Sequence, residues 1–413
     1  MADPSALPRL VEPALVEALS DTPIVLLHGP RQCGKTTLAQ RIGAKQRLPY
    51  LSMDDDAVRA AAQADPAGFV ARLPRRVVID EVQRVPEIFL PLKADVDRQR
   101  EPGRFLLTGS TNVLLLPKLA DSLAGRMGSV RLHPLAQCEI ERRPARFLDK
   151  LARGEFPMRS CARLGEELAA RIVGGGFPAA LARKTAARRR QWHVDYIDAL
   201  VQRDVRDLAR IASLRSLPKL LKLAAGQCAR LLNVSEFADA FQLSRPTIRD
   251  YVTLLERIFL IEELQPWHSN RLKRLVKTPK MHLTDTGLAC SLLGLSPATL
   301  WSERETLGQM AETFVFGELQ RQASASSEPV AFSHFRDRDG QEVDIVLEHP
   351  GARITGVEVK VASSVKPSDF RGLHALRAAV GKRFVCGVVF HDGEVTLGFG
   401  DGMFAVPFAE LWD

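Results

Sequence analysis

Residues 23–36 read PIVLLHGPRQCGKT and decide the fold of the first part of the chain. The apolar run from Pro23 to His28 is typical of a buried strand, and the residues after it match the pattern G-x-x-x-x-G-K-[ST] in full. Gly29 and Gly34 allow the backbone to curl, so that successive N–H groups and the N-terminus of the next helix point toward bound phosphates. The stretch therefore predicts a nucleoside triphosphate site directly after the first strand.

Two side chains of this loop have predicted chemical roles. We expect the Lys35 ammonium to bind the β and γ phosphate oxygens, and the Thr36 hydroxyl to bind Mg²⁺, which prefers substrate phosphates to an all-protein cage. ATP and Mg²⁺ are therefore the predicted cofactors, and the alternative interpretation is a plain glycine turn between a strand and a helix. The loop residues expected to contact the nucleotide are Gly29, Pro30, Arg31, Gln32, Cys33, Gly34, Lys35, Thr36 and Thr37.

A second motif lies at residues 76–81, where a short apolar strand ends in two acids. Asp80 is predicted to join the Mg²⁺ shell, and Glu81 is predicted to orient and deprotonate the attacking water. Because the two motifs perform complementary tasks, together they predict hydrolysis of the nucleotide as well as binding.

A third strand, at residues 104–111, ends in hydroxyl residues, of which Ser110 is the predicted contact with the γ phosphate. The alternative is an ordinary core strand followed by a turn, since Ser and Thr end many strands. Arg126 is a candidate sensor or arginine finger, acting within the chain or across a subunit interface. Its alternative is a solvated surface side chain, and a finger role across an interface would require an oligomer.

Residues 1–140 alternate apolar strands with helical segments, which predicts an α/β fold with a mostly parallel sheet and helices on both faces. We expect a second strand at 49–53 and then a helix at 57–64 that the acids at 54–56 cap. Because this unit separates the phosphate loop from Asp80, the strand of Asp80 should lie one strand away from the first strand. That arrangement is typical of the additional-strand ATPases with a catalytic glutamate. The predicted domains are 1–140 (ATPase), 141–215 (helical linker or lid), 216–300 (winged-helix-like) and 301–413 (nuclease-like).

Residues 234–255 predict a helix-turn-helix. The first helix is expected at 234–241 with Ser235 as its cap, and the second at 244–255 with its apolar residues on one face. In such motifs the first residues of the second helix reach base edges in the major groove, so DNA is a predicted partner. The alternative is a module that packs against protein. The residues expected to contact DNA are Arg245, Thr247 and Arg249, with phosphate contacts from Arg271, Lys273, Arg274 and Lys277.

The C-terminal region, from residue 303 onward, predicts a helix at about 307–322 and then short strands, with a hairpin turn near Gly351. Counting back from this turn places Asp344 opposite Glu358, on the face that Lys360 shares. Paired carboxylates bind Mg²⁺ or Mn²⁺ to polarise a phosphodiester, and a neighbouring lysine positions the water. The alternative is a hairpin with inactive surface charges.

This arrangement of an acid followed by Glu-x-Lys resembles the active site of the restriction-endonuclease-like superfamily. The resemblance implies catalytic roles for Asp344, Glu358 and Lys360, with the two acids as metal ligands. It also implies an extra acid on the preceding helix, as in the Holliday-junction-resolving members, and Glu312 and Glu318 compete for that place.

Over nearly its whole length the chain resembles the prokaryotic AAA-type ATPases that carry a C-terminal domain of unknown function with a nuclease-like fold. The resemblance rests on residues 29–36, 79–83 with Pro86, 107–110, 123–126 and 280–288, and on the set Asp344, Glu358 and Lys360. It implies ATP binding and this fold, and a task on nucleic acid by analogy.

The composition sets the limits of these interpretations. With 413 residues, 46% hydrophobic and 26% charged, the chain is expected to form two or three globular domains. The net charge of +8 favours an acidic partner such as DNA. The scattered cysteines and the lack of a leader or long apolar stretch predict a cytoplasmic protein without a membrane span. A regulatory ATPase with an inactive nuclease-like scaffold, and an ATP-driven switch for a protein partner, are the alternative functions.

Overall fold

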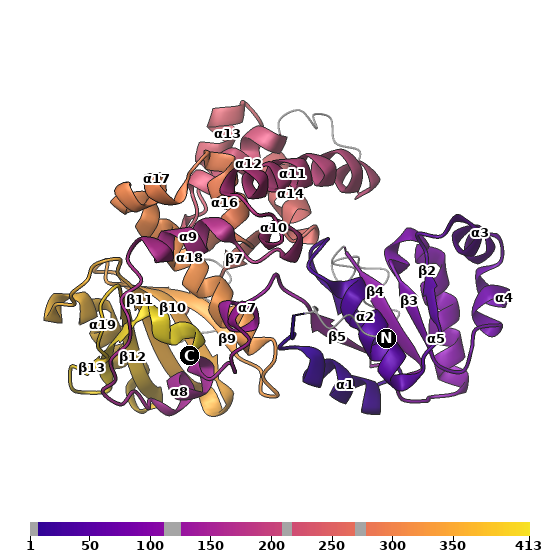
Figure 1. The fold of residues 1–413 in the computed structure, drawn as a ribbon, viewed down its shortest axis with the longest axis horizontal. Coiled ribbons are helices and arrows are strands. Elements are labelled where there is room, and N and C mark those ends of the chain that lie inside the picture. The colour runs from indigo at the N-terminus through magenta and orange to yellow at the C-terminus, as the bar shows by residue number, and fades with distance from the viewer. Residues whose placement is uncertain (1–6, 111–124, 209–216, 269–277) are drawn as a thin grey trace. The chain divides into compact units, whose positions relative to one another are not determined.

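The computed structural model describes residues 7–110, 125–208, 217–268 and 278–413 of the chain (Figure 1). The chain divides into two compact units. The first unit contains residues 1–135 together with Leu255–Phe259, and the second contains Ala136–Leu254 together with Leu260–Asp413. Within the described ranges, no helix is both long and apolar enough to cross a membrane.

The first unit has, in its described part, a five-stranded parallel sheet in the order β2-β3-β4-β1-β5. Strand β4 therefore lies between β1, which precedes the phosphate loop, and β3, which ends at Asp80. This order confirms the expected separation of the two strands. The strands are β1 (Ile24–His28), β2 (Tyr50–Ser52), β3 (Val77–Asp80), β4 (Phe105–Gly109) and β5 (Met127–Arg131).

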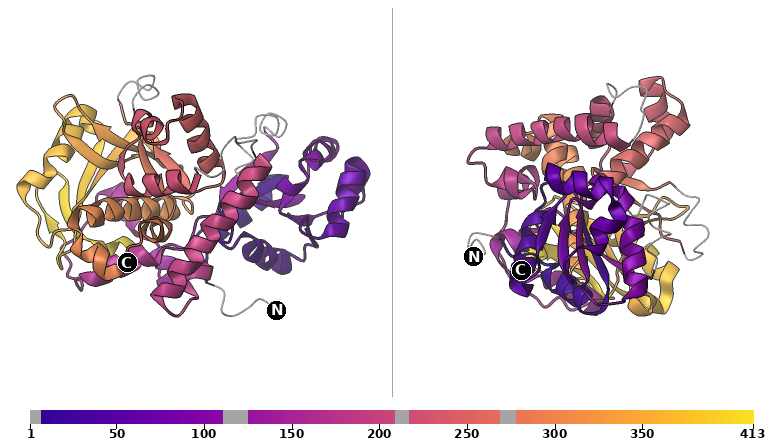
Figure 2. Two further views of the ribbon diagram at one scale, coloured as in Figure 1. Left: turned by 90° about the horizontal axis from the view of Figure 1, so that it is seen from above. Right: turned by 90° about the vertical axis from the view of Figure 1, so that its right-hand side faces the viewer.

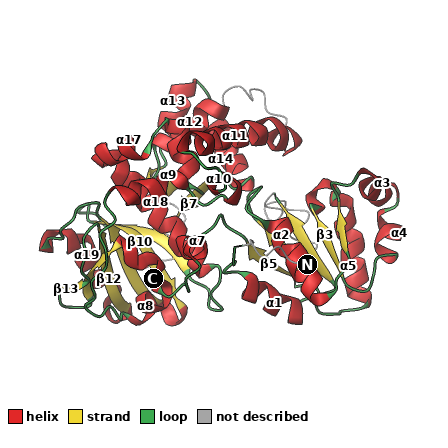
Figure 3. Ribbon diagram, in the orientation of Figure 1, coloured by secondary structure: helices red, strands yellow, loops and turns green. Residues whose placement is uncertain are grey.

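Alternate residues of these strands face two separate cores, because successive side chains of a strand point to opposite faces of the sheet. Ile24 and Leu26 pack in one core with residues of α3, α4 and α5, whereas Val25 and Leu27 pack in the other with α1 and α2. Figure 3 shows these helices in red on both faces of the yellow strands. The helices are α1 (Glu12–Asp21), α2 (Lys35–Gln46), α3 (Asp56–Ala64), α4 (Pro66–Ala71) and α5 (Phe89–Arg98).

The second unit begins with helices. The 23-residue helix α11 is the long magenta-to-pink helix in the left view of Figure 2. These helices are α7 (Gln137–Glu141), α8 (Phe147–Arg153), α9 (Glu166–Gly174), α10 (Pro178–Leu181) and α11 (Ala186–Leu208).

The helix-turn-helix prediction corresponds to α13 and α14, which are followed by two strands of a small sheet in the order β6-β8-β7. The predicted cap was wrong, because α13 begins at Val234 and the Asn233 side chain accepts the N–H groups of Ser235 (3.2 Å) and Glu236 (3.3 Å). The elements are α12 (Leu217–Gly226), β6 (Arg230–Leu231), α13 (Val234–Phe241), α14 (Arg245–Arg257), β7 (Ile261–Leu264) and β8 (Lys280–Leu283).

The C-terminal part of this unit is a mixed six-stranded sheet in the order β13-β14-β12-β11-β10-β9, in the part that is described. Helix α19 packs on the sheet through Leu373 and Leu376, which share a core with Val346 and Val389. The elements are α16 (Thr286–Leu293), α17 (Pro297–Ser302), α18 (Arg304–Ala323), β9 (Ala331–Arg336), β10 (Glu342–His349), β11 (Arg353–Val359), α19 (Arg371–Val380), β12 (Phe384–His391), β13 (Leu397–Gly398) and β14 (Met403–Pro407).

Candidate functional site

The phosphate loop connects β1 to α2, and its shape depends on glycine at two positions. Gly29 has φ +151°, and a Cβ atom there would lie 2.1 Å from the carbonyl oxygen of Leu132, so only glycine fits. Gly34 has φ +102° and directly precedes the first residue of α2. Arg9 links the loop to the segment after β5, because its guanidinium donates to the carbonyl oxygens of Cys33 and His133, at 2.6 Å in both cases.

Lys35 is the first residue of α2 and its ammonium lies against the loop. The side-chain nitrogen donates to the carbonyl oxygens of Gly29 (3.0 Å) and Pro30 (2.7 Å), and the residue is only 4% exposed. These acceptors are neutral, so phosphate oxygens would be stronger partners for the ammonium. The geometry suits a lysine that exchanges loop carbonyls for a nucleotide.

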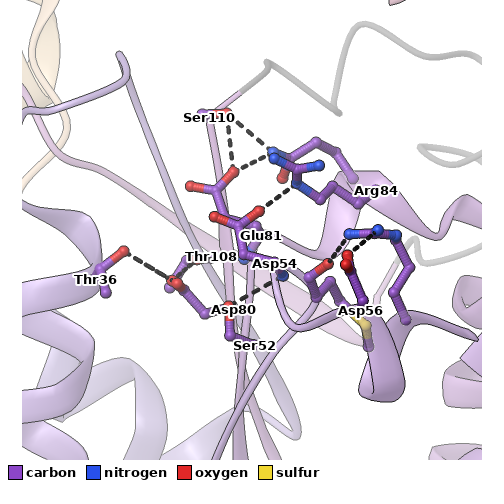
Figure 4. Close-up of polar contacts among 12 residues, drawn as sticks. Thr36, Ser52, Asp54, Asp56, Asp80, Glu81, Arg84, Thr108 and Ser110 are labelled. Atoms are coloured by element: carbon purple, nitrogen blue, oxygen red, sulfur yellow. Dashed lines mark hydrogen bonds and ion pairs between the residues drawn. The ribbon is translucent and has the colours of Figure 1, made fainter.

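Asp80 ends β3 and accepts hydrogen bonds from three hydroxyl groups. The Thr36 hydroxyl lies 3.1 Å from both of its carboxylate oxygens, and the Thr108 hydroxyl donates to one of them (Figure 4). The Tyr50 hydroxyl donates to the other oxygen at 2.8 Å. Burial, and then the hydrogen bond to Asp80, raise the pKa of Tyr50. Thr36 and Asp80 are thus brought together as predicted, and their adjacent oxygens fit a Mg²⁺ ion whose other ligands are phosphate and water.

Glu81 adopts a left-handed backbone with φ +55°, which is uncommon outside glycine. Its N–H donates to the Thr108 hydroxyl (3.0 Å), and its carboxylate accepts from the Ser110 hydroxyl (3.1 Å) and from the Gln83 amide. The Gln83 amide also donates to Ser110 at 2.9 Å. Figure 4 shows Glu81 and Ser110 beside the Thr36 and Asp80 pair. Ser110 therefore contacts the predicted catalytic base itself.

Arg126 lies at the other end of the sheet. The next residue, Met127, pairs with Ile24 at the start of β1, whereas the phosphate loop follows the end of β1. The Arg126 guanidinium pairs with Asp97, with one N–O distance of 3.2 Å. The proposed sensor role within the chain is therefore corrected, because strand β1 separates Arg126 from the loop. A finger role toward a neighbouring subunit stays a prediction, and residues 123 and 124 of that stretch lie outside the described ranges.

The C-terminal hairpin forms as predicted. Residues Ile345 and Val357 are paired between β10 and β11, and continuing this register places Asp344 opposite Glu358. Asp344 accepts the N–H of Val359 at 3.0 Å, and Lys360 donates to one oxygen of Glu358 at 2.7 Å. Burial, and then the charge of Asp344, raise the pKa of Glu358 to about 8.

Lys280, on β8, enters the same cluster of acids. Burial opposes its charge, but the surrounding carboxylates outweigh burial and raise the pKa of Lys280 well above its ordinary value. The side-chain nitrogen lies 2.8 Å from Glu312, 2.9 Å from Glu342 and 3.2 Å from Asp344. No group of three or more His, Cys, Asp or Glu side chains in the described ranges is arranged to hold a metal ion. As they lie, the residues predicted for the second metal do not fit one, because the Lys280 ammonium pairs with Glu312 and Asp344 while Lys360 pairs with Glu358.

The structure also separates the two candidates for the extra acid. Glu312 lies in the cluster with Asp344, through their shared contact with Lys280. Glu318 is fully buried elsewhere, where it accepts from Arg321 (2.8 Å) and from the N–H of Gln137 (2.9 Å). Glu318 therefore joins α18 to α7 and takes no part in the cluster.

Four residues of these sites were not predicted from the sequence: Tyr50, Gln83, Lys280 and Glu342. Glu342 had a usable signal, because it lies two residues before Asp344 and must share its face on a strand. The sequence signal for Lys280 was weaker. A lysine that begins a short apolar strand needs an acidic partner once the strand is buried, but the sequence does not say which acid. Gln83 lies in the stretch 79–83 that carries the family resemblance, but neither Gln83 nor Tyr50 had a signal for its side-chain contact.

Comparison with known proteins gives three family matches. Residues 21–141 match a family described as AAA domain, residues 165–299 match a domain of unknown function (DUF8612), and residues 307–411 match another (DUF4143). Uncharacterized proteins of Mycobacterium tuberculosis (Rv2008c) and Mycobacterium bovis (Mb2031c) are each 30% identical over 399 residues, which covers 96% of this chain and 82% of theirs.

Two solved structures are also similar. A Walker-type ATPase of Pyrococcus abyssi has a TM-score of 0.44 at 17% identity, covering 71% of this chain and 96% of its own. The RuvB Holliday junction branch migration motor of Thermotoga maritima has a TM-score of 0.27 at 19% identity, covering 61% of this chain and 88% of its own.

Proposed function

This chain belongs to the same family as the two mycobacterial relatives, and we propose that it is a Mg²⁺-dependent ATPase with Glu81 as its catalytic base. Its first domain is a P-loop ATPase domain that binds ATP. The observation that carries the proposal is the Thr36 and Asp80 pair, with oxygens 3.1 Å apart, between the phosphate-loop lysine and Glu81.

Each of these residues has a distinct task in hydrolysis. Lys35 leaves the loop carbonyls and binds the phosphate oxygens, while the loop N–H groups orient the triphosphate. Mg²⁺ bound with the nucleotide would neutralise charge on the phosphate oxygens, and Thr36 and Asp80 would hold it. Glu81 orients a water molecule and accepts its proton, after its carboxylate has left Ser110 and Gln83.

The test is phosphate release by the full chain with the Glu81→Gln variant. We expect ATP binding within about twofold of the wild type and a loss of turnover of at least about a hundredfold, since general-base catalysis contributes about that much. The matched control is Glu87→Gln, which changes an exposed acid of the same segment and should leave turnover unchanged. Wild-type turnover in Glu81→Gln would remove Glu81 from the mechanism.

DNA is the second part of the proposed function, and a specific observation favours it. Helices α13 and α14 with strands β7 and β8 follow the element order of a winged helix. Arg245 is exposed at the start of α14, and Arg249, one turn later, has 49% of its side chain exposed while pairing with Glu263 at 3.1 Å. We propose that this end of α14 contacts duplex DNA. The basic residues predicted for phosphate contacts, at 271–277, lie outside the described ranges.

Salt dependence tests DNA binding at low cost, because each neutralised phosphate adds about one unit to the slope of log K against log salt. We expect a steep slope for the wild type and weaker binding for Arg245→Ala. Lys382→Ala removes an exposed cation of the same unit and serves as the control. If low salt reveals no DNA binding, the alternative of an ATP-driven switch for a protein partner is favoured instead.

The C-terminal module is proposed to be a scaffold. The sequence left open a Mn²⁺-dependent nuclease and an inactive nuclease-like scaffold, and the position of Lys280 among the acids favours the scaffold. We expect no cleavage of single-stranded, duplex or branched DNA by the wild type with Mn²⁺. Cleavage that disappears in Lys360→Ala would instead support the nuclease.

A further inference from the structure

The acidic cluster of the C-terminal module draws its carboxylates from two strands and one helix. Glu342 and Asp344 lie two residues apart on β10, Glu358 lies on the neighbouring β11, and Glu312 lies on α18. So many carboxylates in a largely buried place require cations nearby, because an unpaired buried charge is costly.

Lys280 supplies a cation at the centre of this cluster. The Lys280 ammonium donates hydrogen bonds to Glu312 (2.8 Å) and Asp344 (3.2 Å), and it forms an ion pair with Glu342 at 2.9 Å. Lys280 is 3% exposed, whereas the Lys360 side chain is 39% exposed and contacts only Glu358 among these acids. The two lysines therefore differ: Lys280 lies inside the cluster and Lys360 at its edge.

The strand that carries Lys280 is fixed in place. Lys280 pairs with Leu264 of β7 and with Leu231 of β6. His282, two residues on and on the same face, bonds to the Thr313 hydroxyl of α18 at 3.1 Å. The position of the Lys280 side chain is thus fixed by β8, which pairs with two strands and contacts α18, the helix that carries Glu312.

One oxygen of Glu358 is left without a partner. Lys360 bonds to Oε1, but the buried Oε2 has no hydrogen-bond partner. A buried carboxylate oxygen without a donor is rare, so Glu358 keeps one oxygen able to accept a further cation or donor. Removal of the central ammonium would leave the oxygens of Glu312, Glu342 and Asp344 that now contact it without their shared cation, and carboxylate oxygens are the ligands that Mg²⁺ and Mn²⁺ prefer.

From this geometry we infer that the ammonium of Lys280 stands in the place of a divalent metal, as a built-in cation that keeps the C-terminal module metal-free in the intact chain. The inference does not depend on ATP hydrolysis. It concerns a different unit of the chain, and either can fail without the other.

The experiment measures Mn²⁺ binding to the full chain without nucleotide, by the electron paramagnetic resonance signal of free Mn²⁺. All proteins carry Asp80→Asn, so that the phosphate-loop site contributes nothing. Lys280→Met removes the ammonium at similar side-chain length, and Lys382→Met is the matched control. We expect Lys280→Met to bind Mn²⁺ at least about tenfold more tightly than its parent, and Lys382→Met to match the parent. Adding Asp344→Asn to Lys280→Met should abolish the gain, which locates the site.

Two further measurements test the inference in case the Lys280→Met protein is too unstable for the binding assay. Mn²⁺ should raise the melting temperature of Lys280→Met and leave that of Lys382→Met unchanged. In the parent, Asp344→Asn should leave Mn²⁺ binding unchanged. A parent site that Asp344→Asn removes would overturn the inference, and so would a folded Lys280→Met protein that gains no Mn²⁺.

Discussion

Replacing Lys35 with methionine tests the phosphate loop in quantitative terms. In the structure the ammonium makes two hydrogen bonds to loop carbonyls, at 3.0 and 2.7 Å. Binding of ATP exchanges them for two bonds to phosphate oxygens. Because the ammonium is charged in both states, we take about 1.5 kcal/mol for each bond to a neutral carbonyl and about 3 kcal/mol for each bond to an ionised phosphate oxygen, so the exchange contributes about 3 kcal/mol to affinity. Lys35→Met should therefore raise the Kd for ATP about a hundredfold.

Isothermal titration with Mg²⁺ and a non-hydrolysable ATP analogue measures this change. The control is Lys45→Met on the same helix α2, because the Lys45 side chain is 62% exposed, pairs with Glu12 and lies outside the loop. We expect its Kd to stay within about twofold of the wild type. Lys35→Met also leaves two carbonyl oxygens without their donor, so circular dichroism must first show that it is folded. A folded Lys35→Met protein with wild-type affinity would refute the assigned role of the ammonium.

Three other perturbations have defined outcomes. Tyr50→Phe removes one donor from Asp80, worth about 1.5–3 kcal/mol, and should raise the Mg²⁺ concentration for half-maximal hydrolysis about tenfold with little change in nucleotide affinity measured at saturating Mg²⁺. Gly29→Ala places a Cβ 2.1 Å from the Leu132 carbonyl, so nucleotide binding should be lost and the melting temperature lowered; a wild-type titration would contradict this. Burial lowers the pKa of His349 from 6.5 to about 4, and an unfolded chain therefore takes up this proton first. Stability should fall by up to about 3 kcal/mol as the pH drops from about 6.5 to about 4, and urea unfolding should show a smaller fall in His349→Gln.

The amino-terminal site was largely predictable because its chemistry is local. The spacing of Gly29, Gly34 and Lys35 fixes a loop whose backbone does the binding, and an apolar strand that ends in Asp80 and Glu81 can only present those acids at the edge of the sheet. The strand order followed from counting one strand-and-helix unit between the two motifs, and the sheet confirms it. Tyr50 could not be found in this way, because its contact with Asp80 depends on the register between β2 and β3.

The C-terminal site was predictable only along its hairpin. The turn near Gly351 fixed the register that sets Asp344 against Glu358. Lys280 is remote from both in the sequence, and it reaches them only because β8 packs on α18, which is a tertiary contact without a local pattern. A long-range ion pair of this kind changes what a motif predicts, because the acids that predict a metal site are already paired with lysine side chains.

The two acidic sites differ in how their carboxylates are satisfied, and this difference separates a metal site from an ion-pair cluster. Asp80 is surrounded by hydroxyl groups, which are neutral and leave its negative charge available to a cation. Mg²⁺ can bind there by turning the Thr36 hydroxyl from a donor into a ligand. At Asp344 the partner is an ammonium, so a divalent ion would have to displace a buried positive charge that three carboxylates hold. The free energy of binding a divalent ion should therefore be more favourable at Asp80 than at Asp344.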